Sequence, residues 1–371
     1  MVGAKKTYNF CSGPAMLPED VLLKAQAELL NYQNQGDSVM ALSHRSDAFL
    51  EILAQAQQRL AALLDLPDHY RILFMQGGAS AQFSAVPLNL RQNNLPIGFL
   101  DSGYWSQKAL EEAQKYAEVD VIASSQSSGY LKAIEQADYQ LSKPLSYLHY
   151  TPNETIDGNA FYCIPNNQLP NGQEVPLVAD MSSCILSEPI DVSRFGVIYA
   201  GAQKNIGPAG LAIVIVREDL LARSQQNQQA MPRLLNYATV VEQNSMANTP
   251  PTFAIYMANL VFQWLQQQGG LEVIQQRNQA KAELLYQAID SSRLFVNNVE
   301  KNHRSKMNVP FSSQNAELDA KFAEQAQQQG LISLQGHRSK GGLRASIYNA
   351  MPYQGVEALV QFMKSFENQY V

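Results

Sequence analysis

The chain has 371 residues, and at roughly 150 residues per domain this length predicts two or three domains. Hydrophobic residues make up 46% of the chain and charged residues 16%, which excludes a disordered protein because a sizeable core can form. The net charge of −6, without a long basic run, argues against nucleic-acid binding through phosphates.

The first predicted elements are helices over residues 17–36 and 47–64. Pro18 suits the first turn of the earlier helix, and Gly36 suits its end. In the later helix the apolar residues recur at helical spacing: Phe49, Ile52, Leu53, Ala56, Leu60 and Leu63.

Six short apolar runs then alternate with segments of helix length: 71–75, 97–100, 146–150, 176–179, 197–200 and 211–216. This pattern predicts parallel βαβ units with a sheet covered on both faces. Ligands of open α/β sheets bind beyond the carboxyl ends of the strands. We therefore expect the site among the residues that follow the runs: 77–80, 102–105, 151–155, Asp180 and 201–205.

A stiff break at Asn248-Thr249-Pro250-Pro251 precedes two predicted helices, 252–268 and 271–290. The pattern beyond them is α+β, with strands at 307–311 and 343–347 and helices at 316–328 and 355–368. We expect a large domain over 18–264 and a smaller C-terminal domain over 265–371, joined by the N-terminal segment 1–17.

The sequence shows no pattern typical of a membrane span, a secretory signal or a disulfide framework. The longest clean apolar run, 211–216, falls far short of the ~20 residues that span a bilayer. No apolar stretch follows the two lysines near the N-terminus, so we expect no secretory signal. Cys11, Cys163 and Cys184 are too few and too scattered for a disulfide framework. The sequence thus predicts a cytoplasmic protein that does not bind membranes.

Asp180 and Lys204 follow consecutive apolar runs, 204 − 180 = 24 residues apart. A strand-end carboxylate beside a strand-end lysine suits a Schiff-base cofactor, because the lysine can form an imine and the carboxylate can keep a pyridine nitrogen protonated. The alternative is an ordinary surface ion pair. The glycines of Gly201-Ala202-Gln203 and Gly207-Pro208 favour a tight, buried loop instead.

Three further groups of residues suit an anionic, planar ligand. Gly77-Gly78-Ala79-Ser80 can form a phosphate cradle at a helix start, although an ordinary βα turn has the same composition. Trp105 can stack on a planar ring or pack in the core. Arginine reads carboxylate and phosphate, and the chain has Arg344 and two His-Arg pairs, His44-Arg45 and His337-Arg338. The remaining histidines are isolated, so we expect no metal site.

Several longer segments are similar to those of the phosphoserine aminotransferase family. They are Cys11-Ser12-Gly13-Pro14-Ala15-Met16-Leu17-Pro18, Ser43-His44-Arg45, Gln82-Phe83 to Pro87-Leu88-Asn89, His149-Tyr150 to Asp157-Gly158, Tyr199 to Pro208, Asn248 to Pro251, and Arg344 to Ala350. The likeness runs from about residue 8 to the end of the chain, and the segments around Lys204 and Arg344 are the most specific.

The resemblance implies a fold-type I pyridoxal phosphate enzyme, an α/β protein with a mixed, mainly parallel sheet between helices and a smaller α+β domain. It implies a homodimer with shared active sites. It further implies amino transfer between phosphoserine and 2-oxoglutarate, giving 3-phosphohydroxypyruvate and glutamate in serine biosynthesis. Many bacterial members also act on 4-phosphohydroxythreonine in pyridoxine biosynthesis.

The resemblance also implies roles for individual residues. Lys204 matches the Schiff-base lysine and Asp180 its partner at the ring nitrogen. Further cofactor-binding positions are Ala79, Ser80, Trp105, Thr155 and Gln203, with Asn248 and Thr249 donated by the other subunit. Substrate-binding positions are Ser12, Arg344 for the α-carboxylate, and His337 and Arg338 for the far anion, with His44 and Arg45 from the partner. Some members have Gly-Arg where this chain has Ala79-Ser80, so one arginine contact is missing here.

Other functions fit the sequence less well. A cysteine desulfurase needs a reactive cysteine late in the chain, whereas the last one here is Cys184. The two His-Arg pairs argue against an alanine–glyoxylate type aminotransferase, whose substrate lacks a second anion. A nucleotide-binding α/β protein would carry G-x-G-x-x-G or a P-loop, and this chain has neither. A non-catalytic binding module would not explain why Lys204, Asp180 and Trp105 all follow predicted strands.

Overall fold

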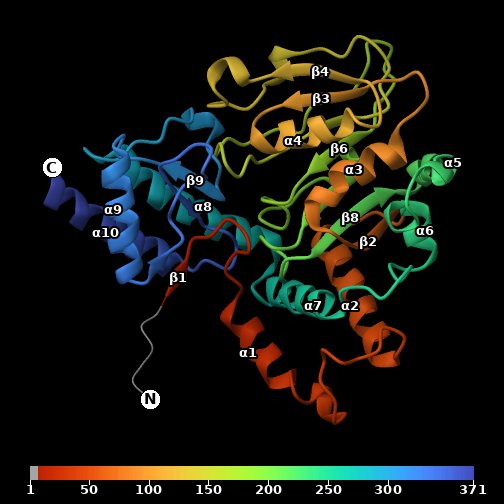
Figure 1. Ribbon diagram of the computed structural model, residues 1–371, viewed down its shortest axis with the longest axis horizontal. Coiled ribbons are helices and arrows are strands. Elements are labelled where there is room, and N and C mark those ends of the chain that lie inside the picture. Colours follow the sequence, from red (N-terminus) through yellow and green to blue (C-terminus); the bar gives the residue numbers. More distant parts are fainter. Residues whose placement is uncertain (1–6) are drawn as a thin grey trace.

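The computed structural model describes residues 7–371, whose centre is a seven-stranded sheet (Figure 1). The strand order is β2-β8-β7-β6-β5-β3-β4. These strands are β2 (Tyr70–Gln76), β3 (Ile97–Asp101), β4 (Val119–Ser124), β5 (Leu148–Tyr150), β6 (Leu177–Asp180), β7 (Val197–Gly201) and β8 (Leu211–Arg217). The pairs from β7 to β4 are parallel, whereas β8 is antiparallel to both its neighbours. The mixed, mainly parallel sheet is confirmed.

The direction of β8 corrects the expectation of parallel units throughout. Residues 202–210 connect β7 to β8 without a crossover helix. A parallel connection needs a dozen or more residues to return to the starting edge, so this short loop forces an antiparallel pair. Lys204 therefore lies in a short connection between two central strands.

Helices cover both faces of the sheet, and the side chains of each strand alternate between the two layers (Figure 1). Leu211, Ile213 and Ile215 of β8 pack in one core, and Val214 and Val216 pack in the other. The first core is covered by α2 (Asp47–Leu63) and α7 (Thr252–Gln267), with α1 (Glu19–Glu28) against α7. The second lies under α3 (Gly78–Leu90), α4 (Tyr104–Ala113), α5 (Leu221–Gln226) and α6 (Tyr237–Glu242).

A separate core forms from the C-terminal third of the chain and the first described residues. Its helices are α8 (Gly270–Asp290), α9 (Ala316–Gln328) and α10 (Tyr353–Tyr370). Its strands are the antiparallel pair β9 (Asn308–Phe311) and β11 (Leu343–Ser346), and the parallel pair β1 (Tyr8–Asn9) and β10 (Leu331–Ile332). Phe10 is fully buried in this core, so the start of the chain packs with its end.

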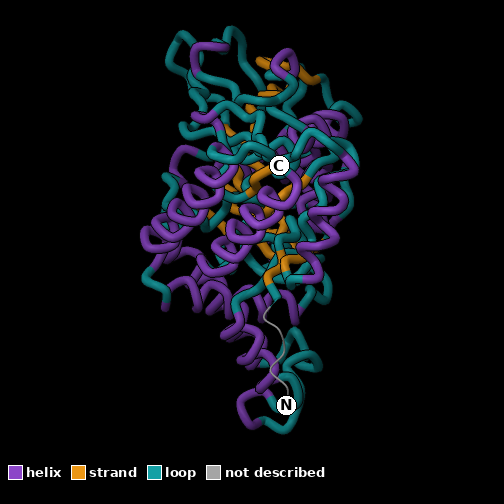
Figure 2. Tube along the Cα trace, turned by 90° about the vertical axis from the view of Figure 1, so that its left-hand side faces the viewer, coloured by secondary structure: helices purple, strands orange, loops and turns teal. Residues whose placement is uncertain are grey.

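The helix expected over 17–36 is shorter than predicted, because α1 ends at Glu28. Gln33 and Asn34 have φ values of 48° and 61°, which a right-handed helix cannot contain. This polar segment and α1 project from the body of the molecule (Figures 1 and 2).

Strand β4 was not predicted, because at the sheet edge its residues are only partly buried and form no apolar run. No helix within residues 7–371 is both long and apolar enough to cross a membrane.

Candidate active site

A cavity of about 470 Å³ opens where β2, β5, β6 and β7 end. Because β8 runs in the opposite direction, it contributes the residues that precede it, Ala209 and Gly210. The structure thus brings together seven of the predicted site residues in the lining: Ala79, Ser80, Trp105, Thr155, Asp180, Gln203 and Lys204.

The Lys204 amine lies inside this cavity. Its Nζ donates to Thr155 Oγ1 at 2.6 Å and lies 5.7 Å from the centre of the Trp105 ring. Burial lowers the pKa of Lys204 from 10.5 to about 8, and the negative charge of Asp180 opposes this shift. The lowered pKa increases the unprotonated fraction of this amine near neutral pH, and the unprotonated form is the one that attacks a carbonyl carbon.

The Asp180 carboxylate, which ends β6, is only 5% exposed. Ser182 donates to Asp180 Oδ1 from its backbone N (3.0 Å) and from its hydroxyl (2.5 Å). Burial raises the pKa of Asp180, while Lys204 and the Ser182 bonds act in the opposite direction. The Ser182 hydroxyl also accepts from Gly201 N (3.0 Å), so one side chain ties the ends of β6 and β7 together.

The start of α3 has the geometry of an anion cradle. Gly77 and Gly78 have φ values of 92° and 63°, and a Cβ on Gly77 would lie 2.6 Å from the Cβ of Ala81. A side chain at Gly77 would therefore clash. Ala79 and Ser80 follow in the first turn, where backbone N–H groups lack partners inside the helix and the dipole favours an anion.

Trp105 is held by two carboxylates that cap α4. Glu154 accepts from the backbone N of Trp105 and of Ser106, both at 2.9 Å, and Asp157 accepts from Tyr104 N at 2.7 Å. Negative groups at a helix start satisfy its free N–H groups and its dipole. Burial and the neighbouring Asp157 raise the pKa of Glu154 from 4.5 to about 8.

Arg344 and Ser12 meet beside Thr155. Arg344 Nη2 donates to Ser12 Oγ (2.7 Å), and Nη1 donates to the Thr155 carbonyl (3.4 Å). Burial lowers the pKa of Arg344. No carboxylate within residues 7–371 forms an ion pair with this guanidinium, so its charge is available to a ligand.

His337 and Arg338 lie on a loop that reaches across to the α4 cap. The His337 ring lies 5.3 Å from that of Tyr104, and Lys340 of the same loop pairs with Asp157 at 2.8 Å. Burial lowers the pKa of His337. Arg338 is exposed beside it.

Eight of the fifteen predicted site residues are absent from the lining of this cavity. Ser12, Arg344, His337 and Arg338 belong to the groups described above, and the other four are Asn248, Thr249, His44 and Arg45. Asn248 and the Thr249 carbonyl accept from Gln76 Nε2 at 2.9 and 3.2 Å, just before the cradle. His44 and Arg45 lie ahead of α2 and are absent from the lining. All four are the residues that the resemblance assigns to a partner subunit's site.

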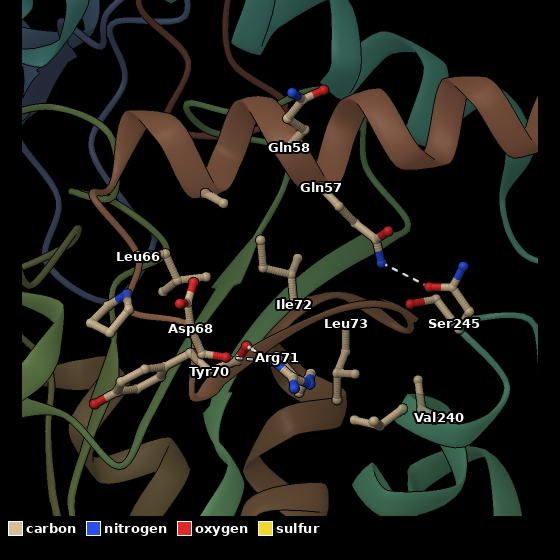
Figure 3. A pocket seen from close by; sticks show the side chains of 14 residues that line it. Gln57, Gln58, Leu66, Asp68, Tyr70, Arg71, Ile72, Leu73, Val240 and Ser245 are labelled. Atoms are coloured by element: carbon tan, nitrogen blue, oxygen red, sulfur yellow. Dashed lines mark hydrogen bonds between the residues drawn. The ribbon is translucent and has the colours of Figure 1, made fainter.

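A second cavity, of about 440 Å³, lies at the open edge of the sheet between α2, β2 and α6 (Figure 3). Gln57 reaches from α2 and donates to Asn244 at 2.9 Å. Arg71 donates to the carbonyls of Asp68 and Tyr70, both at 2.8 Å. No buried amine, thiol or carboxylate lies among the lining residues, all of which are described. We therefore assign the chemistry to the first cavity.

Comparison with known proteins agrees with this assignment. The family model for class-V aminotransferases matches residues 7–359. The phosphoserine aminotransferase of Marinomonas sp. (strain MWYL1) is 52% identical over 365 residues, which cover 98% of this chain and 99% of that protein. The chain belongs to the phosphoserine aminotransferase family. The family member from Pseudomonas aeruginosa is 50% identical over 367 residues, 99% of each chain.

Solved structures of family members superpose closely on this chain. The enzyme from Bacillus circulans subsp. alkalophilus has a TM-score of 0.95 at 46% identity and covers 99% of this chain and 100% of its own. The pyridoxal-phosphate-bound enzyme from Trichomonas vaginalis has a TM-score of 0.91 at 40% identity, covering 97% and 100%. The fold-type I architecture and the assignment as an aminotransferase are confirmed.

Glu154 and Asp157 hold the start of α4 beside the cavity, and the sequence analysis gave neither residue a role, although Glu154 lies in the expected site range 151–155. Asn153-Glu154-Thr155 also has the pattern of a glycosylation site, which gives no indication that the carboxylate caps a helix. Their place just after a predicted strand was an available signal. What they cap could not be predicted, because α4 begins about fifty residues earlier in the chain.

We predict that Glu154→Gln weakens the pH dependence of stability. With its raised pKa, folded Glu154 holds a proton that the unfolded chain releases above pH 4.5. The carboxyl therefore contributes stability that is complete below pH 4.5 and is lost as the pH rises through about 8. Melting temperatures at pH 5 and pH 8 should differ more in the wild type than in Glu154→Gln. Glu111→Gln, on the exposed face of α4, should match the wild type; equal differences in all three proteins would contradict the prediction.

Proposed function

We propose that this chain catalyses the pyridoxal-phosphate-dependent, reversible transfer of an amino group between O-phospho-L-serine and 2-oxoglutarate, giving 3-phosphohydroxypyruvate and L-glutamate. The observation that carries the proposal is the Lys204 amine, whose pKa burial lowers to about 8 in a cavity that it shares with Asp180. Family membership supports the substrate class.

The residues of the cavity fit pyridoxal phosphate. Ala79 and Ser80 present a helix start for the phosphate. The buried side-chain atoms Trp105 Nε1 and Gln203 Oε1 have no hydrogen-bond partner within residues 7–371. Both bonds from Ser182 end on Oδ1 of Asp180, so the other oxygen is available to a ring nitrogen. Unmet buried polar groups are costly unless a ligand satisfies them.

Each side chain of the cavity has a separate role in the proposed reaction. Pyridoxal phosphate supplies an aldehyde carbon and a ring that withdraws electrons when its nitrogen is protonated. Asp180 holds the proton on that nitrogen. Lys204 would take the proton from the substrate Cα as a base and then deliver it as an acid to the aldehyde carbon that the cofactor supplies, a role for which a pKa of about 8 is well matched. Thr155 orients the Lys204 amine, and Trp105 excludes water from one side of the cavity.

Two anion sites account for the paired substrates. Arg344, next to Thr155, binds the α-carboxylate that phosphoserine and glutamate share. His337 and Arg338, with His44 and Arg45 of a second subunit, bind the far group, which is a phosphate in one substrate and a carboxylate in the other. Arginine donors accept both groups. The same two anions occur in 4-phosphohydroxy-L-threonine, which we propose as a further substrate.

We propose a homodimer in which Asn248 and Thr249 complete the partner's phosphate site. Exposed leucines on and beside the projecting α1 support this arrangement, because such a patch marks an interface. They are Leu22, Leu23, Leu29 and Leu30.

We further propose that residues 18–264 and 265–371 act as two domains. The cytoplasmic location stays a prediction.

Lys204→Ala is predicted to abolish transamination and the visible absorbance of the purified enzyme, because no other amine lies among the residues that line the cavity. Spectra before and after adding phosphoserine, with a coupled assay for glutamate, measure both effects. Lys306→Ala, at an ion pair with Glu188 outside the cavity lining, serves as the control and should keep its colour. Retained absorbance with normal turnover in Lys204→Ala would refute the proposed function.

Arg338→Ala is predicted to lower kcat/KM for phosphoserine by roughly 10- to 100-fold, the worth of a charge-assisted hydrogen bond. Turnover of alanine, which lacks a far anion, should change much less. Arg344→Ala should impair both substrates, and Arg293→Ala, at a surface ion pair with Glu367, should impair neither. Equal losses for the two substrates in Arg338→Ala would remove Arg338 from the far-anion site.

Leu30→Asp is predicted to dissociate the dimer and to lower activity, because a charge in an apolar interface is costly and the sites are shared. Sedimentation equilibrium should give twice 41.2 kDa for the wild type and a single chain for the variant. Val121→Asp changes an equally apolar residue that is 52% exposed on β4, and should leave the dimer intact. A monomeric, fully active wild type would disprove shared sites.

A further inference from the structure

Lys281 of α8 is a buried charged side chain that the reaction does not use. It is 2% exposed, and its Nζ donates to three backbone carbonyls, those of Ile347 (3.0 Å), Tyr348 (2.7 Å) and Met351 (3.0 Å). An ammonium group has three N–H donors, so every donor is used. The amine thereby fixes the backbone of residues 347–351 to the middle of α8.

This arrangement is costly. No carboxylate within residues 7–371 pairs with Lys281, and burial, with a smaller effect of Arg277, lowers its pKa from 10.5 to about 7. An apolar side chain of similar length would fill the same space without the cost of desolvating an amine. The value of Lys281 must therefore lie in the carbonyls that it holds.

The segment 347–351 contacts two parts of the proposed site, the surroundings of Arg344 and the loop that carries Lys204. It directly follows β11, the strand that carries Arg344. The Tyr348 hydroxyl donates to the Ser12 carbonyl (2.9 Å), and Ser12 Oγ accepts from Arg344. Asn349 N donates to Asn205 Oδ1 at 3.1 Å, next to Lys204. A displacement of this segment would therefore move the surroundings of Arg344 and of the Lys204 loop together.

A second side chain of α8 holds the same segment. Asn278, one helical turn before Lys281, donates from Nδ2 to Asn349 Oδ1 (2.8 Å) and to the Ser187 carbonyl (3.0 Å). Asn349 in turn donates to the Leu186 carbonyl at 2.8 Å. The segment thus lies between α8 and the loop that follows Asp180, with Lys281 as its only charged anchor among these contacts.

We propose that Lys281 is a positioning residue, which fixes segment 347–351 so that Arg344 is oriented for the α-carboxylate of the amino-acid substrate. The inference rests on the proposed function, since it assigns that carboxylate to Arg344. Lys281 contacts neither substrate nor cofactor, and it acts on affinity for the carboxylate rather than on proton transfer by Lys204.

The test compares two ligands of the purified, cofactor-loaded enzyme. Phosphoserine and phosphoethanolamine share an amine and a phosphate, but only phosphoserine has a carboxylate. Lys281→Met keeps most of the side-chain length and removes the three donors. It should weaken phosphoserine binding about tenfold, and leave phosphoethanolamine binding and kcat within about twofold. Lys364→Met, an exposed lysine of α10, is the matched control.

Hydrogen exchange gives a readout that is independent of turnover and of the cofactor. In Lys281→Met, the amides of residues 347–351 should exchange faster, while those of α9 in the same core should not change. Lys281→Arg, which keeps the charge and the donors, should recover part of the phosphoserine affinity. Equal weakening of both ligands, or unchanged exchange in 347–351, overturns the proposal.

If Lys281→Met does not fold, Asn278→Ala takes its place, because it releases Asn349 and leaves the ammonium in position. A phosphoserine-selective loss in Asn278→Ala supports the positioning role of the segment, and unchanged affinity overturns it. A wild type that binds phosphoserine no better than phosphoethanolamine overturns the proposed function itself. A wild-type preference that Lys281→Met retains in full overturns only the inference about Lys281.

Discussion

The amine of Lys204 and the carboxylate of Asp180 are both buried at neighbouring strand ends, and the surrounding residues must stabilise them there. Burial lowers the pKa of Lys204 and raises that of Asp180, and each charge restrains the shift of the other. The two hydrogen bonds from Ser182 to Asp180 offset part of the cost of burying this carboxylate. The bond from Gly201 N to the Ser182 hydroxyl fixes Ser182 in place. The register of β6 against β7 therefore determines how the loop that carries Lys204 leaves the sheet beside Asp180.

Around the cavity, buried ionisable side chains form hydrogen bonds with backbone atoms rather than ion pairs with opposite charges. Glu154 accepts two N–H groups at the start of α4, and Lys281 donates to three carbonyls after β11. Several hydrogen bonds from one buried side chain hold a main-chain segment in one conformation. Trp105 lies within the first of these segments and Arg344 lies just before the second, so these contacts help to position both side chains.

The sequence predicted those features of the site that depend on local order along the chain. The strand runs were visible, and the strand-end rule correctly grouped Asp180, Lys204 and Trp105 around one cavity. The direction of β8 was not visible, because its apolar run reads the same in either direction. The end of α1 at Glu28 and the capping by Glu154 depend on contacts between distant segments, which no local pattern contains.

The pairing of β1 with β10 has a consequence for how the protein is made. Tyr8 lies opposite Leu331, and Phe10 is enclosed by residues from the C-terminal helices. During synthesis β1 therefore cannot form this pairing until β10 has emerged from the ribosome. Ser12, which follows that segment directly, reaches Arg344 only at that late stage. The contact between Ser12 and Arg344, which belongs to the proposed α-carboxylate site, therefore depends on residues that are synthesised more than three hundred positions apart.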